Sequence, residues 1–253
     1  MKNILVQGLA GLAFTFVTLS AHATPIIVTA GATTGIQIVE PSYGYIKMST
    51  TAVGMFNAFK INGMTASNGA SVTLAQKTNT STGVTSWANI AFNVPLQAIT
   101  FDSDNKGLLS EDFRGSFKMV ATPSVFTTGG ELTLSNLRVD YMTKTVYATV
   151  VGANGVGTRY NAALWSYDSV AGDLIFPGGN IQTTVSALRL TADGLNIWAQ
   201  SLGYTNNGRL VLASTNQSAA GLGTLSTIVS TTGAPPTPPQ CPAPAAHAAP
   251  SPF

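Results

Sequence analysis

Apolar and polar residues alternate in short runs along the middle of the chain, which is the pattern of half-buried β-strands. The clearest runs are residues 130–141 (GELTLSNLRVDY) and 145–151 (TVYATVV). In the first run the alternation slips by one position at Ser135-Asn136, which predicts a β-bulge or a bend. Because only three residues separate the two runs, together they predict a β-hairpin.

Similar runs on both sides of this hairpin predict an all-β fold, a β-sandwich-like domain. Glycine-rich turns at residues 152–155, 177–180 and 206–208 separate several of them. No polar linker interrupts residues 24–232, so this span is expected to form a single domain. Further strands are expected at residues 26–30, 35–40, 69–76, 96–102, 114–121, 161–167, 183–190, 208–214 and 224–230.

Two segments have helical periodicity instead. Residues 49–59 (STTAVGMFNAF) and 191–202 (TADGLNIWAQSL) each place apolar side chains at helical spacing after a Ser or Thr cap. We therefore expect two short α-helices in the domain. Residues 46–59 and 188–201 also align without a gap, 142 residues apart. This similarity indicates either a duplicated strand–helix unit or two independent amphipathic helices.

The two ends of the chain differ from the domain between them. Residues 1–23 combine Lys2, an apolar run and a small-residue site ending at Ala23, which predicts a secretory signal peptide; a single membrane anchor is the alternative. Residues 233–253 hold eight of the 13 prolines and are expected to be a disordered tail. Cys241, the only cysteine, lies in this tail and is either available for an intermolecular bond or without a role.

Charge and composition exclude several classes of function. Charged residues make up 9 % of the chain, against roughly 25 % in ordinary soluble domains, and the net charge is +2. Such a chain cannot form the basic surface that nucleic acids need. Both histidines, His22 and His247, lie in the terminal segments, which removes His-based catalysis and zinc binding from the domain. A hydrolase that uses two carboxylates stays open, although no spacing in the sequence pairs two of them.

One acidic cluster suggests a cation site. Residues 102–107 (DSDNKG) place Asp102 and Asp104 on alternate positions before a glycine, and Glu111 follows closely. This order resembles the start of a calcium-binding loop, in which oxygen ligands alternate and glycine allows a sharp turn. The alternative is a solvated turn without a metal.

Aromatic residues supply the remaining candidates for ligand binding. Trp87 lies in a Thr/Ser/Asn-rich stretch, and Tyr43 and Tyr45 follow a proline, so these three are expected at the surface, where rings can stack on a sugar or a flat ligand. Trp165 and Trp198 are expected in the core, because they lie among apolar residues with strand or helix spacing.

Two segments of the C-terminal half resemble a known family. Residues 129–152 (GGELTLSNLRVDYMTKTVYATVVG) are similar to the hairpin of HtaA-type domains, and residues 190–203 (LTADGLNIWAQSLG) to their late L-T-A-x-G helix. Similar hairpins occur in exported bacterial β-proteins of the PEP-CTERM kind. The resemblance implies an all-β extracytoplasmic domain and, for HtaA domains, haem binding, but it carries over no axial ligand, and the C-terminal sorting signal is missing.

These observations predict an exported, non-catalytic bacterial protein of the cell surface or extracellular matrix, with the periplasm as an alternative location. Its partner would be a protein or an extracellular polymer, and the mature chain would have no transmembrane segment and no required cofactor. The alternatives are a ligand-binding module for haem or a glycan, with calcium as a structural ion, and a carboxylate-dependent glycoside hydrolase.

Overall fold

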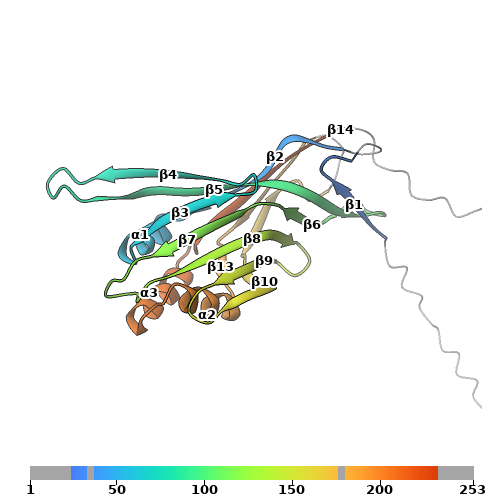
Figure 1. The fold of residues 1–253 in the computed structure, drawn as a ribbon. Coiled ribbons are helices and arrows are strands. Elements are labelled where there is room, and N and C mark those ends of the chain that lie inside the picture. The colour runs from blue at the N-terminus through green and yellow to red at the C-terminus, as the bar shows by residue number, and fades with distance from the viewer. Residues whose placement is uncertain (1–23, 33–36, 176–179, 233–253) are drawn as a thin grey trace, which may run out of the picture.

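The computed structural model describes residues 24–32, 37–175 and 180–232 (Figure 1). The expected signal peptide, the proline-rich tail and Cys241 lie outside these residues. The described chain is mostly β-strand, with a few short helices, so the predicted all-β, sandwich-like fold is confirmed. None of the helices in the described part is long and apolar enough to cross a membrane.

The strands and helices follow one another along the chain in this order. They are β1 (Pro25–Thr29), β2 (Gln37–Met48), α1 (Thr50–Ala58), β3 (Ile61–Ser67), β4 (Ser71–Thr78), β5 (Thr85–Asp102), β6 (Leu108–Phe113), β7 (Ser116–Ala121), β8 (Gly130–Asp140), β9 (Thr145–Gly152), β10 (Gly157–Ser166), β11 (Ser169–Gly172), β12 (Ile181–Ser186), β13 (Arg189–Leu190), α2 (Ala192–Ser201), α3 (Asn206–Asn216) and β14 (Gly223–Thr232).

One antiparallel sheet is folded over on itself to make two layers. Strand β5 belongs to both layers: its first half pairs with β4 and β2, and its second half with β1 and β6. We call the layer β11-β12-β14-β2-β5-β4 sheet B, and the layer that contains β6, β8, β9, β10 and β13 sheet A. Alternate residues of both layers fill the space between them, as expected for a sandwich core.

The predicted hairpin is formed by β8 and β9, and the predicted slip is a register shift. The pairing changes between Ser135 and Arg138, and Asn136 has a positive φ of 49°. An extra residue at this point lets the apolar side chains on both sides of the shift face the core.

Helices α1 and α2 begin as predicted. The Ser49 and Thr191 hydroxyls each accept a hydrogen bond from the backbone N–H three residues later, which satisfies a free donor of the first turn. Phe56 and Trp198, which occupy aligned positions in the two similar segments, stack on each other with ring centroids 5.9 Å apart. The two strand–helix units therefore meet in the core through equivalent residues.

The prediction of a strand at residues 208–214 is wrong, because this segment lies within the third helix, α3. Thr205 caps this helix, and its hydroxyl accepts from the Gly208 N–H at 3.3 Å. A side chain at Gly208 would overlap the Phe126 carbonyl oxygen, so the helix packs closely on the preceding loop. The sequence Asn206-Asn207-Gly208 is thus a first helical turn and not the predicted loop.

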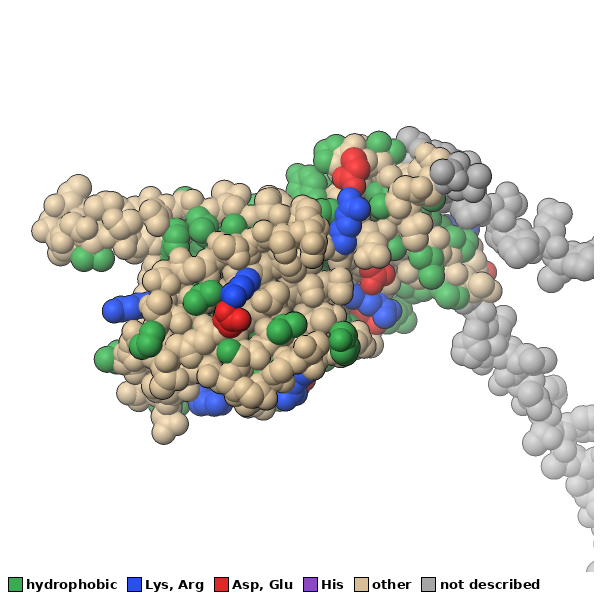
Figure 2. All heavy atoms as spheres, in the orientation of Figure 1, with side chains coloured by type: hydrophobic (Ala, Val, Ile, Leu, Met, Phe, Trp, Pro, Cys, Tyr) green, Lys and Arg blue, Asp and Glu red, His purple; other side chains and the backbone are tan. Residues whose placement is uncertain are grey.

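A two-stranded arm projects from the body of the molecule. It consists of β4 and the first part of β5, and it passes beside α1 and extends beyond the rest of the sheet (Figure 1). Lys77 is the only charged residue in 71–89. In the view of Figure 2 the arm shows no charged side chain, and charges on the rest of that face are few.

Candidate binding face

The outer face of sheet B carries exposed and partly exposed side chains from several neighbouring strands. In β2 the even-numbered residues from Ser42 to Met48 are buried, and the odd-numbered residues Tyr43, Tyr45 and Lys47 are partly or fully exposed. Residues opposite one another in antiparallel strands point to the same side. The register therefore defines which residues of the neighbouring strands share this face.

The face is almost uncharged. Its residues are Tyr43, Tyr45 and Lys47 of β2, Thr224, Ser226 and Ile228 of β14, Gln182, Thr184 and Ser186 of β12, Ser169 and Ala171 of β11, Asn93 and Pro95 of β5, and Ser71 and Thr73 of β4. Lys47 is the only charged side chain among these described residues. Most of the others carry hydroxyl or amide groups, so the face offers many hydrogen-bonding groups without a strong electrostatic field.

Tyr43 and Tyr45 lie side by side in the middle of this face. Two positions apart on one strand, their side chains are separated by about 6.5–7 Å along the strand. Both rings are half-buried against neighbouring strands. Within the described part of the chain neither phenol makes a hydrogen bond, so each presents an apolar ring and an unpaired hydroxyl to the outside.

Two hollows lie at the ends of the tyrosine pair. The smaller, about 290 Å³, is lined by Glu40, Tyr43, Asn93 and their neighbours. The larger, about 570 Å³, is lined by Lys47, the start of α1, and Ser and Thr residues of β11, β12 and β14. The larger one is within the size range of small-molecule sites.

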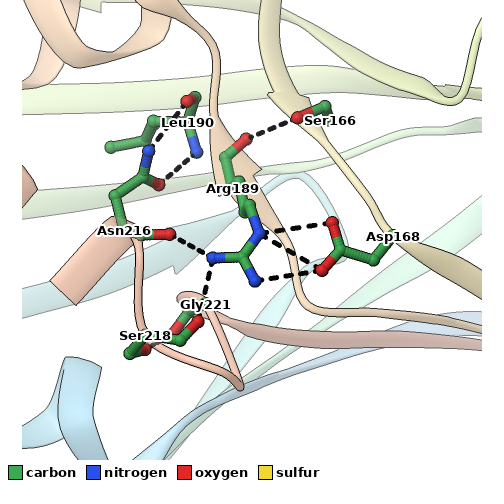
Figure 3. A network of polar contacts seen from close by, with 7 residues as sticks. All are labelled: Ser166, Asp168, Arg189, Leu190, Asn216, Ser218 and Gly221. Carbon is green, nitrogen blue, oxygen red and sulfur yellow. Dashed lines mark hydrogen bonds and ion pairs between the residues drawn. The ribbon is translucent and has the colours of Figure 1, made fainter.

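Arg189 holds one wall of the larger hollow in place (Figure 3). Its guanidinium donates to the Asp168 carboxylate at 3.0–3.2 Å and to the carbonyl oxygens of Asn216 and Ser218 at 2.5 and 2.8 Å. The Asn216 amide in turn bonds both backbone groups of Leu190, at 2.6 and 3.0 Å. These contacts fix the loop that carries Ala219 and Ala220, which lines the hollow.

The same guanidinium also sets the ionisation of Asp168 at the edge of the face. Its hydrogen bonds to the carboxylate lower the pKa of Asp168 below its ordinary value. Asp168 therefore stays ionised and paired. It leaves Lys47 as the unpaired charge of the hollow among the described residues.

Trp87 lies apart from the two tyrosines, on the arm, where it pairs with Gln76 of β4. Its indole N–H donates to the Ile61 carbonyl at 2.9 Å, and its backbone N–H and carbonyl bond the Asn57 side chain at 2.8 and 2.9 Å. It borders a third hollow of about 240 Å³ with Lys60 and Gln76. These bonds connect the arm to α1 and β3 through Trp87. The structure therefore does not bring Trp87, Tyr43 and Tyr45 into one site.

The three predicted calcium ligands are not brought together either. Asp102 accepts from the backbone N–H of Asp104 at 2.7 Å, and Asp104 accepts from the Ser103 hydroxyl at 2.9 Å, as in a plain turn. The Glu111 side chain points between the two layers instead. No group of three metal-binding side chains occurs among the residues that the structure describes.

Glu111 is fully buried and joins sheet A to sheet B. Its carboxyl accepts from the Thr227 hydroxyl at 2.6 Å and the Thr183 hydroxyl at 3.2 Å, and Tyr141 bonds Thr183 at 3.0 Å. Burial penalises the ionised form and raises the pKa of Glu111 to about 7, although these hydroxyls partly oppose the shift. Burial also raises the pKa of the neighbouring Tyr141 well above its ordinary value.

Two other carboxylates do share a hollow on sheet A. Asp112 and Asp140 line a space of about 470 Å³, with Arg138 between them at 4.0 and 3.8 Å from their carboxylate oxygens. Asp140 also accepts two backbone N–H groups of the following turn at about 3 Å. Arg138 thus bridges the pair, and Asp140 is engaged in holding the hairpin turn.

Among the described residues, neither hollow of this face brings together two side chains of the kinds that ligate haem iron. Haem iron is held in proteins by His, Cys, Met or Tyr side chains. The described part of the chain contains no His or Cys, and of these types only Met48 lines the larger hollow. Met48 is 7 % exposed and also borders a small void in the core with Phe92 and Trp198. Tyr43 and Tyr45 lie outside that hollow, on the open face.

Comparison with known proteins gives a likeness in structure only. No family model and no curated protein sequence matches the chain. Solved structures similar to it include two from Corynebacterium glutamicum: the C-terminal domain of HtaA (14 % identity, 76 % of this chain and 98 % of that one, TM-score 0.40) and the heme binding protein HtaB (11 %, 83 % and 96 %, TM-score 0.41).

The N-terminal domain of HtaA from the same organism is also similar, at 13 % identity over 75 % of this chain and 96 % of that one, with a TM-score of 0.39. These proteins belong to the group that residues 129–152 and 190–203 resemble. The PEP-CTERM part of the resemblance has no counterpart among these structures. At such identities and TM-scores the likeness says nothing of a shared ligand.

Proposed function

We propose that this chain is a non-catalytic binding domain that acts outside the cytoplasm, at a cell surface or in an extracellular matrix. The observation that carries the proposal is the outer face of sheet B. It is wide, nearly uncharged and rich in hydroxyl and amide groups, with two partly exposed tyrosines at its centre. A surface of this kind suits contact with an uncharged partner.

The location rests on the apolar leader at residues 1–23. Cleavage after Ala23 gives a mature protein that begins at Thr24. Mass spectrometry of the protein recovered from the medium or the cell surface tests this. An uncleaved chain that stays in the cytoplasm contradicts the location.

Binding through the face is tested with one charge substitution and its matched control. Ser226 lies opposite Tyr45, so Ser226→Glu places a carboxylate at the centre of the face. The control, Thr158→Glu, places the same charge on an exposed position of β10 in sheet A.

The assay is co-sedimentation of the full chain with insoluble surface and matrix material from the cells that produce it. We expect Ser226→Glu to weaken binding by about tenfold or more, since a desolvated, unpaired charge opposes contact. Thr158→Glu is expected to bind like the unchanged protein. Equal binding by all three proteins would contradict the proposal.

A carboxylate-dependent hydrolase is the second candidate, because Asp112 and Asp140 share one hollow. Arg138 between them and the backbone bonds to Asp140 oppose this role, since neither carboxylate is free to act as a base. A screen for glycoside hydrolysis decides between the two. Activity that Asp112→Asn abolishes would replace the binding proposal with this one.

A further inference from the structure

We infer that the outer face of sheet B binds a neutral polysaccharide chain lengthwise along β2, with the rings of Tyr43 and Tyr45 as its stacking platforms. This inference rests on the proposed function, because it names the partner of the same face. It follows from the charge of the face, the state of its tyrosines, the two hollows and the pairing of β2.

The charge of the face selects a neutral partner. Lys47 is the only charge among the residues that form it, and Glu40 and Asp168 at its margins are both engaged with arginines, Arg114 and Arg189. A negatively charged polymer could pair only with Lys47 on this face. A positively charged polymer would meet no unpaired carboxylate among the described residues of the face and its margins. A chain of uncharged, hydroxyl-bearing units loses little by meeting this surface, because its hydroxyls can exchange water for the Ser, Thr, Asn and Gln groups around them.

The tyrosines have the form that a sugar ring requires. A pyranose ring has apolar C–H groups on its faces and hydroxyls on its rim, so it packs on an aromatic ring and bonds with polar groups at the ring's edge. Tyr43 and Tyr45 each offer a partly exposed ring and a phenol without a partner among the described residues. Their spacing of about 6.5–7 Å along β2 allows two successive rings of one chain to be contacted.

The hollows extend this contact in both directions. From Tyr43 to Lys47 is four residues of strand, about 13 Å. Glu40 and Asn93 line the hollow at the Tyr43 end, and Lys47 with hydroxyls of Ser186 and Thr224 lines the one at the other end. The two tyrosine rings thus lie in a row between two polar hollows. This arrangement fits an extended chain better than a compact ligand.

The pairing of β2 argues against a peptide as the occupant. Extended peptides bind sheets by adding a strand at an open edge, where backbone groups are unpaired. Strand β2 is paired with β14 on one side and β5 on the other along residues 43–47. Only side chains are offered at the centre of this face, and side chains are what a polysaccharide contacts.

The test is native affinity electrophoresis of the full chain in gels that contain a soluble polysaccharide. The neutral probes are hydroxyethyl cellulose, arabinoxylan, galactomannan and dextran, and alginate is the acidic comparator. We expect at least one neutral polysaccharide to retard the protein more than alginate does. Retardation by alginate alone, or by none of the five, would overturn the inference.

Matched variants locate the contact. Tyr43→Ala and Tyr45→Ala should each raise the dissociation constant by about tenfold, because a stacking platform is lost. Tyr43→Phe should keep much of the affinity. Tyr160→Ala, at a tyrosine that is 79 % exposed on sheet A, should leave binding unchanged. If Tyr160→Ala weakens binding as much as Tyr45→Ala does, the inference is wrong.

The failure of this inference can be told apart from failure of the proposed function. One outcome is that Ser226→Glu abolishes co-sedimentation with surface material while no polysaccharide retards the protein. In that case the face binds another partner, and only the inference of a polysaccharide is wrong. If Ser226→Glu has no effect on co-sedimentation, the face is not the binding surface, and both the proposed function and the polysaccharide inference are wrong.

Discussion

The buried carboxyl of Glu111 makes the stability of the fold depend on pH. In the folded protein the pKa of Glu111 is about 7, against an ordinary value of 4.5, because burial disfavours the charged form. Below pH 4.5 the group is protonated in both the folded and the unfolded chain. Between pH 4.5 and 7 the folded chain keeps a proton that the unfolded chain has lost, so the free energy of unfolding falls as the pH rises.

The size of this effect follows from the shift. One pKa unit corresponds to about 1.4 kcal/mol, so a shift from 4.5 to about 7 removes about 3 kcal/mol of stability between pH 4.5 and pH 8. Glu111→Gln has nearly the same shape and cannot ionise. We expect it to lie within about 1 kcal/mol of the unchanged protein at pH 4.5, and to be more stable by about 2–3 kcal/mol at pH 8.

The measurement is urea unfolding of both proteins at half-unit steps from pH 4.5 to 8.5, followed by tryptophan fluorescence. The difference between the two curves removes the contributions of the other titrating groups. Glu131→Gln is the control, because Glu131 is exposed and pairs with Lys118 at the surface. It should change the free energy of unfolding by less than about 1 kcal/mol.

Two results would refute the reasoning. A difference between the proteins that does not vary with pH would mean that Glu111 does not titrate between pH 4.5 and 8. A Glu111→Gln protein that is less stable at pH 8 would mean that the hydroxyls of Thr183 and Thr227 stabilise the carboxylate by more than burial costs it.

Three further substitutions test the packing by urea unfolding. Gly54→Ala, at an open position of α1, should stabilise the protein by about 0.5–1 kcal/mol, and a loss would contradict the helix there. Gly194→Ala in α2 should cost more than about 2 kcal/mol, because its Cβ would overlap the Leu164 carbonyl; a neutral effect would contradict that packing. Asn57→Ala should cost about 1–3 kcal/mol and speed hydrogen exchange of the Trp87 amide, whose partner it removes, and unchanged exchange would contradict that contact.

Features that depend on a few neighbouring residues could be predicted from the sequence. The β8–β9 hairpin, its register shift near Ser135 and the caps Ser49 and Thr191 all follow from local patterns. Each is decided by backbone geometry and hydrogen bonds within a few positions, so the residues themselves carry the information.

Features that depend on tertiary contacts could not be predicted this way. The sequence predicts a strand where α3 forms, because Leu210 and Leu212 alternate after an apparent turn, whereas the packing of Gly208 on Phe126 decides the helix. Strands β3 and β6 and the first half of β5 have weak alternation, so the sequence pattern does not predict them. Pairing with distant strands completes their hydrogen bonds: β3 pairs with β7, β6 with β8, and the first half of β5 with β2.

The candidate site shows the same division. Tyr43 and Tyr45 are expected at the surface because they follow a proline, and in the structure the alternation along β2 leaves both partly exposed. The position of Glu111 could not be derived, since the threonines that bond it lie 72 and 116 residues further along the chain. Arg189 was likewise unpredicted as a site residue, because its partners come from the start of β11 and the end of α3.

Hydroxyl-radical footprinting of the tyrosines tests the central claim, that the outer face of sheet B is the binding surface, most directly. The full chain is exposed to radicals with and without the surface material it binds, and oxidation is measured at each tyrosine by mass spectrometry. We predict that the partner protects Tyr43 and Tyr45 and leaves Tyr160 on sheet A as reactive as before. Protection of Tyr160 with Tyr43 and Tyr45 unchanged would place the binding surface on the opposite layer and contradict the claim.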